Sequence, residues 1–416
     1  MLLVGAGIIG VVKSGLGVAA GLVAVGAGLA VGLAAVSAVG QGVSAASGIT
    51  AVAEKKEMFG KSIIFSIIPE TQALMGFLIA ILIMIGTGLM GASDKLAGLG
   101  IPTGLVAVGA ALAIGIAAVS AVGQGYVVSA GIASVLRDVK MFGKALLFSV
   151  LPQTQALYGF LISVLLLVGG GIIGASRPDL SLPLGLVSIG AGLAVGFAAI
   201  SAMGQGIAAA SAVASVTEDN KRFGKSILFS VLPETQALYG FLVAILLLVG
   251  GGIIGATKAS LSVPAGLIAV GAGLAVGLGA VSAIGQGIAA SSGVGATAEN
   301  DKVFGKSILF SVLPETQALY GIIIAILLMT GAGLLGALKS GITIMQGLGG
   351  IGAGIAIGFS AVSAVGQGVV SAMSIGASVR NPKSTGKGLV LSVMPETYAI
   401  FGLLISILIM IGLHIL

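Results

Sequence analysis

Four acidic residues lie inside long apolar stretches of the chain, whereas the other nine lie in polar segments. A carboxylate at the middle of a bilayer costs ~2.5–3.5 kcal/mol even on a lenient insertion scale. An acid at that depth therefore marks an ion pathway, unless it is a protonated group that packs helices. Recurrence at one position of an internal repeat favours the ion pathway. The four residues are Glu70, Glu234, Glu315 and Glu396.

A glutamine lies 29 residues before each of these acids, in a Gly-Gln-Gly motif that recurs five times at intervals of 83, 81, 81 and 81 residues. The midpoint between glutamine and acid falls in a charged segment. Two antiparallel helices leaving a turn there bring both residues to one membrane depth. In the second repeat the acid is replaced by Gln153, which can neither titrate nor neutralise a cation, so we predict no ion at that position. The glutamines are Gln41, Gln124, Gln205, Gln286 and Gln367.

Polar residues that follow each acid point away from it. At ~100° per residue, Gln236 lies about 200° around a helix from Glu234, while Thr235 and Tyr239 share a face. One hairpin cannot easily direct all of them at one ion. We therefore predict that each site lies between adjacent hairpins, with Gln and Glu from one and Thr, Gln and Tyr from the other.

The groups at such a site are hard oxygen ligands. They comprise one carboxylate, amide and hydroxyl oxygens, and a backbone carbonyl near the proline that precedes the acid. Pro233 lacks an N–H, so the Phe229 carbonyl loses its helical donor, and the Leu232 carbonyl is a second candidate that the proline can reorient. Oxygen ligands favour Na⁺ as the transported ion. A proton carrier needs only a carboxyl group in an apolar pocket, so H⁺ remains the alternative.

The composition predicts the elements that hold these residues. The chain is 57% apolar and 8% charged, and its apolar stretches exceed the ~20 residues that span a bilayer. We expect an all-α membrane protein with ten transmembrane helices in five tandem hairpins. The first helix of each hairpin is rich in small residues and belongs inside a crowded assembly, and the bulkier second helix faces lipid. The predicted hairpins are 13–94, 95–176, 177–257, 258–338 and 339–416, and 1–12 resembles the end of a second helix.

Basic residues indicate the orientation. Fourteen of the 19 lie in the loops within hairpins, and five, Lys13, Lys95, Arg177, Lys258 and Lys339, lie on the opposite side. The positive-inside tendency places the hairpin loops in the cytoplasm and both termini on the other side of the cell membrane. The chain has no Cys and one His, at position 414, so we expect no catalytic site and no cofactor. Without a basic face, nucleic acid is not an expected partner.

The repeated segment Leu-Pro-Glu-Thr-Gln-Ala-Leu-Tyr-Gly, as at 232–240, follows a Gly-rich helix that ends in Gly-Gln-Gly. This pattern resembles the proteolipid (c or K) subunits of archaeal and bacterial A/V-type rotary ATPases over essentially the whole chain. The resemblance implies a rotor ring built with other copies of the chain and coupled to ATP hydrolysis or synthesis. It also implies a stator membrane subunit with an arginine, and central-stalk subunits at the cytoplasmic loops.

Carried over residue by residue, the resemblance implies three complete sodium sites. They are Gln205 and Glu234 with Thr154, Gln155 and Tyr158; Gln286 and Glu315 with Thr235, Gln236 and Tyr239; and Gln367 and Glu396 with Thr316, Gln317 and Tyr320, with the carbonyls of Leu151, Leu232 and Leu313 as backbone ligands.

Two positions depart from the sodium pattern. Met75 replaces the tyrosine next to Gln153. Glu70, with Gln41, would meet a fifth hairpin that offers Thr397, Tyr398 and Phe401, so its sodium shell is incomplete. Two other function classes remain open, a secondary transporter or channel that uses the same glutamates and a purely structural proteolipid. Five hairpins of one direction are unlike the inverted repeats common in transporters.

Overall fold

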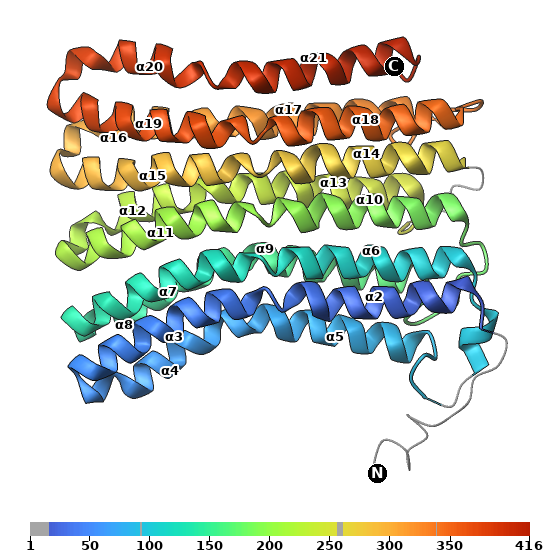
Figure 1. Cartoon of the computed structure of the whole chain (residues 1–416), viewed down its shortest axis with the longest axis horizontal. Coiled ribbons are helices and arrows are strands. Elements are labelled where there is room, and N and C mark those ends of the chain that lie inside the picture. The colour runs from blue at the N-terminus through green and yellow to red at the C-terminus, as the bar shows by residue number, and fades with distance from the viewer. Residues whose placement is uncertain (1–15, 92–93, 256–260, 338) are drawn as a thin grey trace.

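The computed structural model describes residues 16–91, 94–255, 261–337 and 339–416. Ten helices in this part of the chain are long and apolar enough to cross a membrane. They pair into five hairpins that lie side by side, with the hairpin loops at one end and the connecting segments and the C-terminus at the other (Figure 1). The all-α fold of five tandem hairpins is therefore confirmed. The predicted helix remnant at 1–12 lies outside the described residues.

The ten spans form two layers. The first layer holds α2 (Val18–Ala34), α3 (Ser37–Glu54), α6 (Ile101–Ala117), α7 (Ser120–Arg137), α10 (Leu182–Ala198), α11 (Ser201–Glu218), α14 (Val263–Gly279), α15 (Ser282–Glu299), α18 (Ile344–Ser360) and α19 (Ser363–Arg380). The second holds α4 (Phe59–Ile67), α5 (Thr71–Gly86), α8 (Phe142–Val150), α9 (Thr154–Gly169), α12 (Phe223–Val231), α13 (Thr235–Gly251), α16 (Phe304–Val312), α17 (Thr316–Gly331), α20 (Thr385–Val393) and α21 (Glu396–Gly412).

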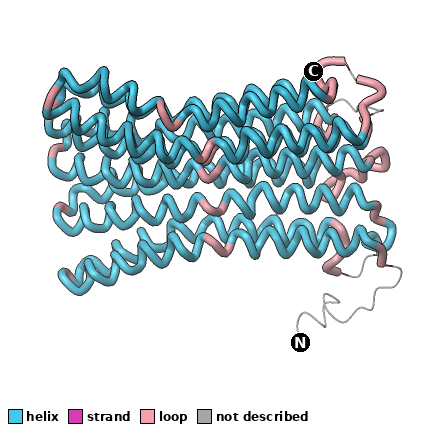
Figure 2. Tube along the Cα trace, turned by 45° about the horizontal axis from the view of Figure 1, so that its top comes forward, coloured by secondary structure: helices cyan, strands magenta, loops and turns pink. Residues whose placement is uncertain are grey.

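The first-layer spans are interrupted near their middle by short turns, which Figure 2 draws as loops, and the second-layer spans are interrupted by 3₁₀ turns or, in the fifth hairpin, by a turn at 394–395. In the second layer the cause is the proline of the repeated motif, which removes one helical donor and produces a 3₁₀ turn such as η7 (Leu232–Glu234). The first-layer spans look continuous in the sequence, yet they tighten at two residues such as Ala199 and Ile200. No proline is present there, and the backbone keeps its hydrogen bonds by switching to i→i−3 pairing, as in Ala202 N to Ala199 O at 3.0 Å.

First-layer helices approach each other at glycine. A Cβ atom on Gly204 would overlap the carbonyl oxygen of Ala283, and one on Gly206 would overlap that of Gly123. These glycines flank Gln205, so the Gly-Gln-Gly motif lets neighbouring backbones touch on both sides of the glutamine. In the third hairpin, 67% of the residues in the most apolar window of the first span are buried, whereas in the second span of that hairpin the share is 44%. The expected division into a crowded layer and a more exposed layer is therefore present.

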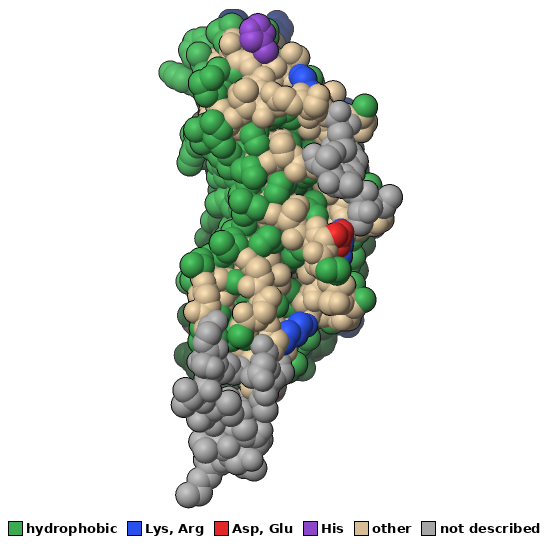
Figure 3. Space-filling view, turned by 90° about the vertical axis from the view of Figure 1, so that its right-hand side faces the viewer, with side chains coloured by type: hydrophobic (Ala, Val, Ile, Leu, Met, Phe, Trp, Pro, Cys, Tyr) green, Lys and Arg blue, Asp and Glu red, His purple; other side chains and the backbone are tan. Residues whose placement is uncertain are grey.

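The second layer presents large apolar side chains outward. Leu238, Leu242 and Val249 on α13 are 44%, 47% and 52% exposed. Seen from the end that carries the connecting segments, the molecule has a curved outline, with the first layer on the hollow side and hydrophobic side chains along it (Figure 3). Exposed apolar surface of this extent fits a multi-pass membrane protein.

Adjacent hairpins interlock at the loop end. The ammonium group of Lys225 on α12 pairs with Asp301 of the next hairpin and lies 5.3 Å from the ring centroid of Phe304. One hairpin earlier, Lys144 donates to Asn220 Oδ1 at 2.5 Å and lies 5.5 Å from the ring of Phe223. A lysine of one hairpin thus contacts the turn of the next by a polar contact and a cation–π contact.

At the opposite end, Arg177 joins two second-layer helices. Its guanidinium donates to the carbonyls of Gly169, at the end of α9, and of Gly252 and Ile253, after α13, at 2.7 to 2.9 Å. Cations stabilise helix C-termini because the last carbonyls lack helical donors. Arg177 also bonds Asp179, and this hydrogen bond lowers the pKa of the aspartate.

Candidate functional site

The glutamates lie at the interruptions of the second-layer spans. Glu234 is the last residue of the 3₁₀ turn η7, directly before α13, and Gln205 lies in α11 of the same hairpin. Gln205 Nε2 donates to Glu234 Oε2 at 3.0 Å, across the 29 residues that separate them. The two helices of one hairpin therefore bring the amide and the acid together, as the spacing predicted.

The preceding hairpin supplies the other partners of this carboxylate. Thr154 Oγ1 and Tyr158 OH, both on α9, donate to Glu234 Oε1 at 2.8 and 3.1 Å. Gln155 Nε2 donates to Gln205 Oε1 at 2.7 Å. Oε2 of Glu234 thus accepts from its own hairpin and Oε1 from the preceding hairpin, so the site lies at the boundary between two hairpins.

Four oxygen atoms of the predicted sodium shell converge on one another. Thr154 Oγ1 lies 2.9 Å from the Leu151 carbonyl oxygen, 3.0 Å from Gln155 Oε1 and 2.8 Å from Glu234 Oε1. Leu151 begins the 3₁₀ turn that contains Pro152. One formal negative charge among neutral oxygens is the donor set that suits a monovalent hard cation.

The next two sites repeat this arrangement with small differences. Glu315 accepts from Gln286 at 3.0 Å, and from Thr235 and Tyr239 at 2.8 and 2.7 Å.

Glu396 accepts from Gln367 at 3.3 Å and from Tyr320 at 2.6 Å, whereas Thr316 bonds the Leu313 carbonyl and Gln317 Oε1, both at 3.1 Å. The second-layer amides bridge to the first-layer glutamines in both sites, Gln236 to Gln286 at 2.8 Å and Gln317 to Gln367 at 2.7 Å.

The second hairpin differs where Gln153 replaces the acid. Gln124 Nε2 donates to the backbone carbonyl of Ser149 at 2.9 Å and lies 3.4 Å from Gln153 Oε1. Gln72 from the first hairpin still bridges to Gln124 Oε1 at 2.8 Å. The hydrogen-bonded amides of the other sites, which we call the polar frame, are therefore retained at this position without a carboxylate.

Glu70 occupies the free edge of the first hairpin. It accepts from Gln41 Nε2 at 2.9 Å, which matches the contact within the other hairpins. Its second set of partners would come from a helix beyond this edge. The corresponding residues at the opposite edge, Tyr398 and Phe401 on α21, are 65% and 61% exposed.

Five segments match the protein family described as the C subunit of ATP synthase, at residues 25–83, 108–166, 189–247, 270–328 and 351–409. Each segment contains one first-layer glutamine and one glutamate position. The chain belongs to this ATP synthase family. It is a proteolipid (c/K) subunit of an A/V-type ATPase, a non-catalytic, ion-translocating component.

Relatives of this proteolipid have K-subunit names. The chain is 53% identical over 231 residues to the A-type ATP synthase subunit K of Methanocaldococcus jannaschii, an alignment that covers 55% of this chain and 97% of that protein. It is 35% identical over 117 residues to the V-type sodium ATPase subunit K of Enterococcus hirae, covering 28% and 71%. A third relative, the A-type ATP synthase subunit K of Sulfolobus acidocaldarius, is 41% identical over 95 residues, covering 22% and 94%.

The sequence did not predict the contact that holds one of the bridging amides of this proteolipid. Ser282 Oγ donates to Gln236 Oε1 at 2.8 Å and so holds the amide that bridges to Gln286. Ser282 lies four residues before that glutamine. A serine occupies the same repeat position in all five hairpins, but its partner differs from one to the next. Ser37 donates to the Ala34 carbonyl at 2.8 Å, and the buried hydroxyls of Ser201 and Ser363 have no hydrogen-bond partner within the described residues. The repeat position therefore does not predict this contact.

Proposed function

We propose that this proteolipid carries Na⁺ through the membrane on Glu234, Glu315, Glu396 and Glu70, as part of a rotor ring coupled to ATP hydrolysis or synthesis. The observation that carries the proposal is the meeting of two hairpins at each internal glutamate. Oε2 of Glu234 accepts from its own hairpin and Oε1 accepts from the preceding one. A carboxylate with this many donors is oriented and ready to receive a cation.

Sodium is favoured over the proton by the neutral oxygens. A proton carrier needs only a carboxyl group in an apolar pocket, whereas Thr154 Oγ1, Gln155 Oε1 and the Leu151 carbonyl beside the acid are further oxygen ligands for a hard cation. Within the described residues, no three acidic or histidine side chains cluster as a multivalent metal site would require. The name of the Enterococcus hirae relative, a sodium ATPase subunit, supports the same ion.

The mechanism follows from charge and exposure. A bound Na⁺ neutralises Glu234, so the loaded site faces lipid as a neutral unit beside exposed side chains such as Leu238. Without the ion, the carboxylate needs a compensating positive charge, which the arginine of a stator membrane subunit would supply. The ring then moves in steps, because each glutamate must exchange its ion there before it returns to lipid.

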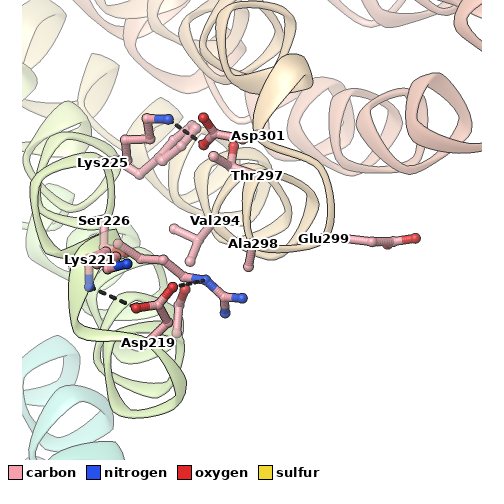
Figure 4. A pocket seen from close by; sticks show the side chains of 12 residues that line it. Asp219, Lys221, Lys225, Ser226, Val294, Thr297, Ala298, Glu299 and Asp301 are labelled. Atoms are coloured by element: carbon pink, nitrogen blue, oxygen red, sulfur yellow. Dashed lines mark hydrogen bonds and ion pairs between the residues drawn. The ribbon is translucent and has the colours of Figure 1, made fainter.

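The hairpin-loop end is the proposed cytoplasmic side and the docking face for central-stalk subunits. A cleft of about 420 Å³ lies there between the third and fourth hairpins (Figure 4). It is lined by charges of both signs, with Asp219 and Arg222 on one wall and Glu299 and Asp301 on the other. Such a mixed surface suits a charged protein partner. The connecting segments and the C-terminus would then face the other side of the membrane.

Labelling of the purified ring with a hydrophobic carbodiimide, with and without Na⁺, tests the function. Peptide mass mapping should show labelling of Glu234, Glu315 and Glu396 that Na⁺ suppresses, while Gln153 provides an unreactive control within the same preparation. Labelling that responds to pH and not to Na⁺ would make the ring a proton carrier. Absence of labelling at all four glutamates would overturn their assignment as carriers.

A further inference from the structure

The two edges of the chain hold complementary halves of one more site. On the first hairpin, Gln41 and Glu70 are joined by a 2.9 Å hydrogen bond, as in the complete sites. On the fifth hairpin, Thr397 Oγ1 donates to the Met394 carbonyl at 2.9 Å, the contact that Thr154 makes to Leu151. The curvature of the chain and the identical direction of its hairpins make a second copy the occupant of either edge.

The half-site on α21 lacks two groups that the internal half-sites contain. In place of Gln236 or Gln317 it has Tyr398, and in place of Tyr239 or Tyr320 it has Phe401. Those glutamines bridge to the first-layer glutamine of the next hairpin at 2.7 to 2.8 Å, and those tyrosines donate to its glutamate at 2.6 to 2.7 Å.

Tyr398 does not reproduce the amide. Its ring is longer and stiffer than a glutamine side chain, and it packs edge to face on Phe401, with ring centroids 6.3 Å apart. In an internal site, the Gln155 amide places its oxygen beside Thr154 and donates an N–H to Gln205. A phenol has a single oxygen, so Tyr398 cannot offer both an amide oxygen to a cation and an N–H to Gln41. Phe401 has no hydroxyl for the carboxylate.

We propose that the site at the junction between two copies, with Gln41 and Glu70 from one and Met394 and Thr397 from the other, binds sodium more weakly than the three sites inside each chain. The inference rests on the proposed function of the glutamates as sodium carriers. One ring then contains two classes of carrier, and the junction sites fill only at higher Na⁺ concentration. The difference lies in one missing amide ligand and one missing hydrogen bond to the carboxylate.

The test compares four glutamates in one preparation. The purified ring of full-length chains is labelled with carbodiimide at a fixed pH over a series of Na⁺ concentrations, and the midpoint of protection is read for each glutamate peptide. We expect the Glu70 midpoint to be about tenfold or more above those of Glu234 and Glu315, as loss of one hydrogen bond to a charged group produces. Equal midpoints would overturn the inference.

Reciprocal variants separate ligand loss from position in the ring. Tyr398→Gln with Phe401→Tyr should lower the Glu70 midpoint toward the internal value, and Gln236→Tyr with Tyr239→Phe should raise that of Glu315 alone. Native mass spectrometry reports whether each variant still forms the ring. If the restoring variant forms the ring and leaves Glu70 unchanged, the proposed cause is wrong. If Na⁺ protects no glutamate, the sodium function itself fails, an outcome distinct from equal midpoints.

Discussion

At the level of single residues, the glutamate joins two hairpins through its two oxygens. Gln286 reaches Glu315 Oε2 from the same hairpin, while Thr235 and Tyr239 reach Oε1 from the preceding one. Any movement that separates adjacent hairpins therefore breaks contacts on one oxygen only. The ion binding that we propose would therefore be coupled to hairpin packing through this carboxylate.

Replacement of Tyr239 by Phe should weaken sodium binding at Glu315. The variant loses the 2.7 Å hydrogen bond to Oε1, and a hydrogen bond to a charged group contributes about 1.5–3 kcal/mol. We expect about a tenfold or greater rise in the Na⁺ midpoint of carbodiimide protection at Glu315, with Glu234 unchanged. Tyr126→Phe, the same change at an exposed position on α7, is the matched control. A shift at both glutamates would point to a general loosening of the ring.

Replacement of Gln153 by Glu should create a fifth carrier. Hairpin one already presents Thr71 Oγ1 within 2.9 Å of the Ile68 carbonyl and 3.0 Å of Gln72 Oε1. The new acid should be labelled by carbodiimide and protected by Na⁺, less tightly than Glu234 because Met75 offers no hydroxyl. Gln153→Leu, which has no carboxyl group, gives the background. Labelling that Na⁺ never suppresses would mean that the retained polar frame does not bind the cation.

The sequence predicts which residues of the site contact one another, but it does not predict the orientation of their side-chain amides. Repeat spacing predicts that Thr154 and Tyr158 meet Glu234, because equivalent residues of adjacent hairpins lie at the same membrane depth and on the same helix face. Two hydrogen bonds were not predicted: Gln124 donates to the Ser149 carbonyl at 2.9 Å, and Ser282 donates to Gln236. Both depend on side-chain rotation among partners of similar energy, which repeat spacing does not specify.

At the level of elements, composition predicts the ten spans and their two layers, and the proline motif predicts the loss of a helical hydrogen bond in the second layer, where the structure has 3₁₀ turns such as η7. The interruption of the first layer at residues such as Ala199 and Ile200 could not be read from the sequence. It needs no proline or unusual dihedral angle, and the i→i−3 hydrogen bonds that form it keep the backbone groups paired without a special residue type.

Replacement of Gly285 by Ala should destabilise the packing of the first layer. A Cβ atom there would overlap the Ala364 carbonyl oxygen on the neighbouring α19, and overpacking of this kind costs about 1–3 kcal/mol. We expect a lower unfolding temperature of the purified ring, followed by thermal denaturation in detergent. Gly295→Ala is the control on the same helix, because no heavy atom lies within 4 Å of its added Cβ. Equal unfolding temperatures would argue against close backbone contact.

Replacement of Arg177 by Ala should loosen the ends of α9 and α13. The variant loses hydrogen bonds to the carbonyls of Gly169, Gly252 and Ile253, each of which a charged donor now satisfies. Hydrogen exchange should quicken in peptides that cover these helix ends, by about tenfold for each 1.4 kcal/mol lost. Arg222→Ala at the opposite end, where the partner Glu218 is mostly exposed, should leave those peptides unchanged. Slow exchange in both variants would contradict the role of Arg177.

At the level of the whole molecule, the five hairpins contain four glutamates and one glutamine, Gln153, at the proposed carrier position. If the glutamates are the carriers that we propose, a ring of such hairpins moves fewer ions per rotation than its number of hairpins suggests. With the hydrolytic cycle unchanged, each ATP would then move fewer ions against a larger gradient. This ratio would favour pumping over synthesis, because synthesis needs more ions per ATP when the gradient is small.

The junction between copies can be tested with cysteines, since the chain contains none. Inside the chain, Ser211 and Ser291 of adjacent hairpins lie with their hydroxyl oxygens 2.5 Å apart. The same repeat positions at the two edges are Met373, which is 72% exposed, and Ala46. If copies join as adjacent hairpins do, Met373→Cys with Ala46→Cys should give an oxidation-dependent ladder of chains on a non-reducing gel.

The matched control is Ser211→Cys with Ser291→Cys, which should cross-link within one chain and leave its oligomeric mass on the gel unchanged. Either single edge variant should remain monomeric in denaturant, because a disulfide needs both halves within about 4 Å between Cβ atoms. An edge pair that never cross-links while the internal pair does would show that a second copy does not lie against the fifth hairpin as adjacent hairpins lie within the chain. In that case the second set of ligands for Glu70 would not come from α21, and the weaker sodium binding inferred from Tyr398 and Phe401 would lose its basis.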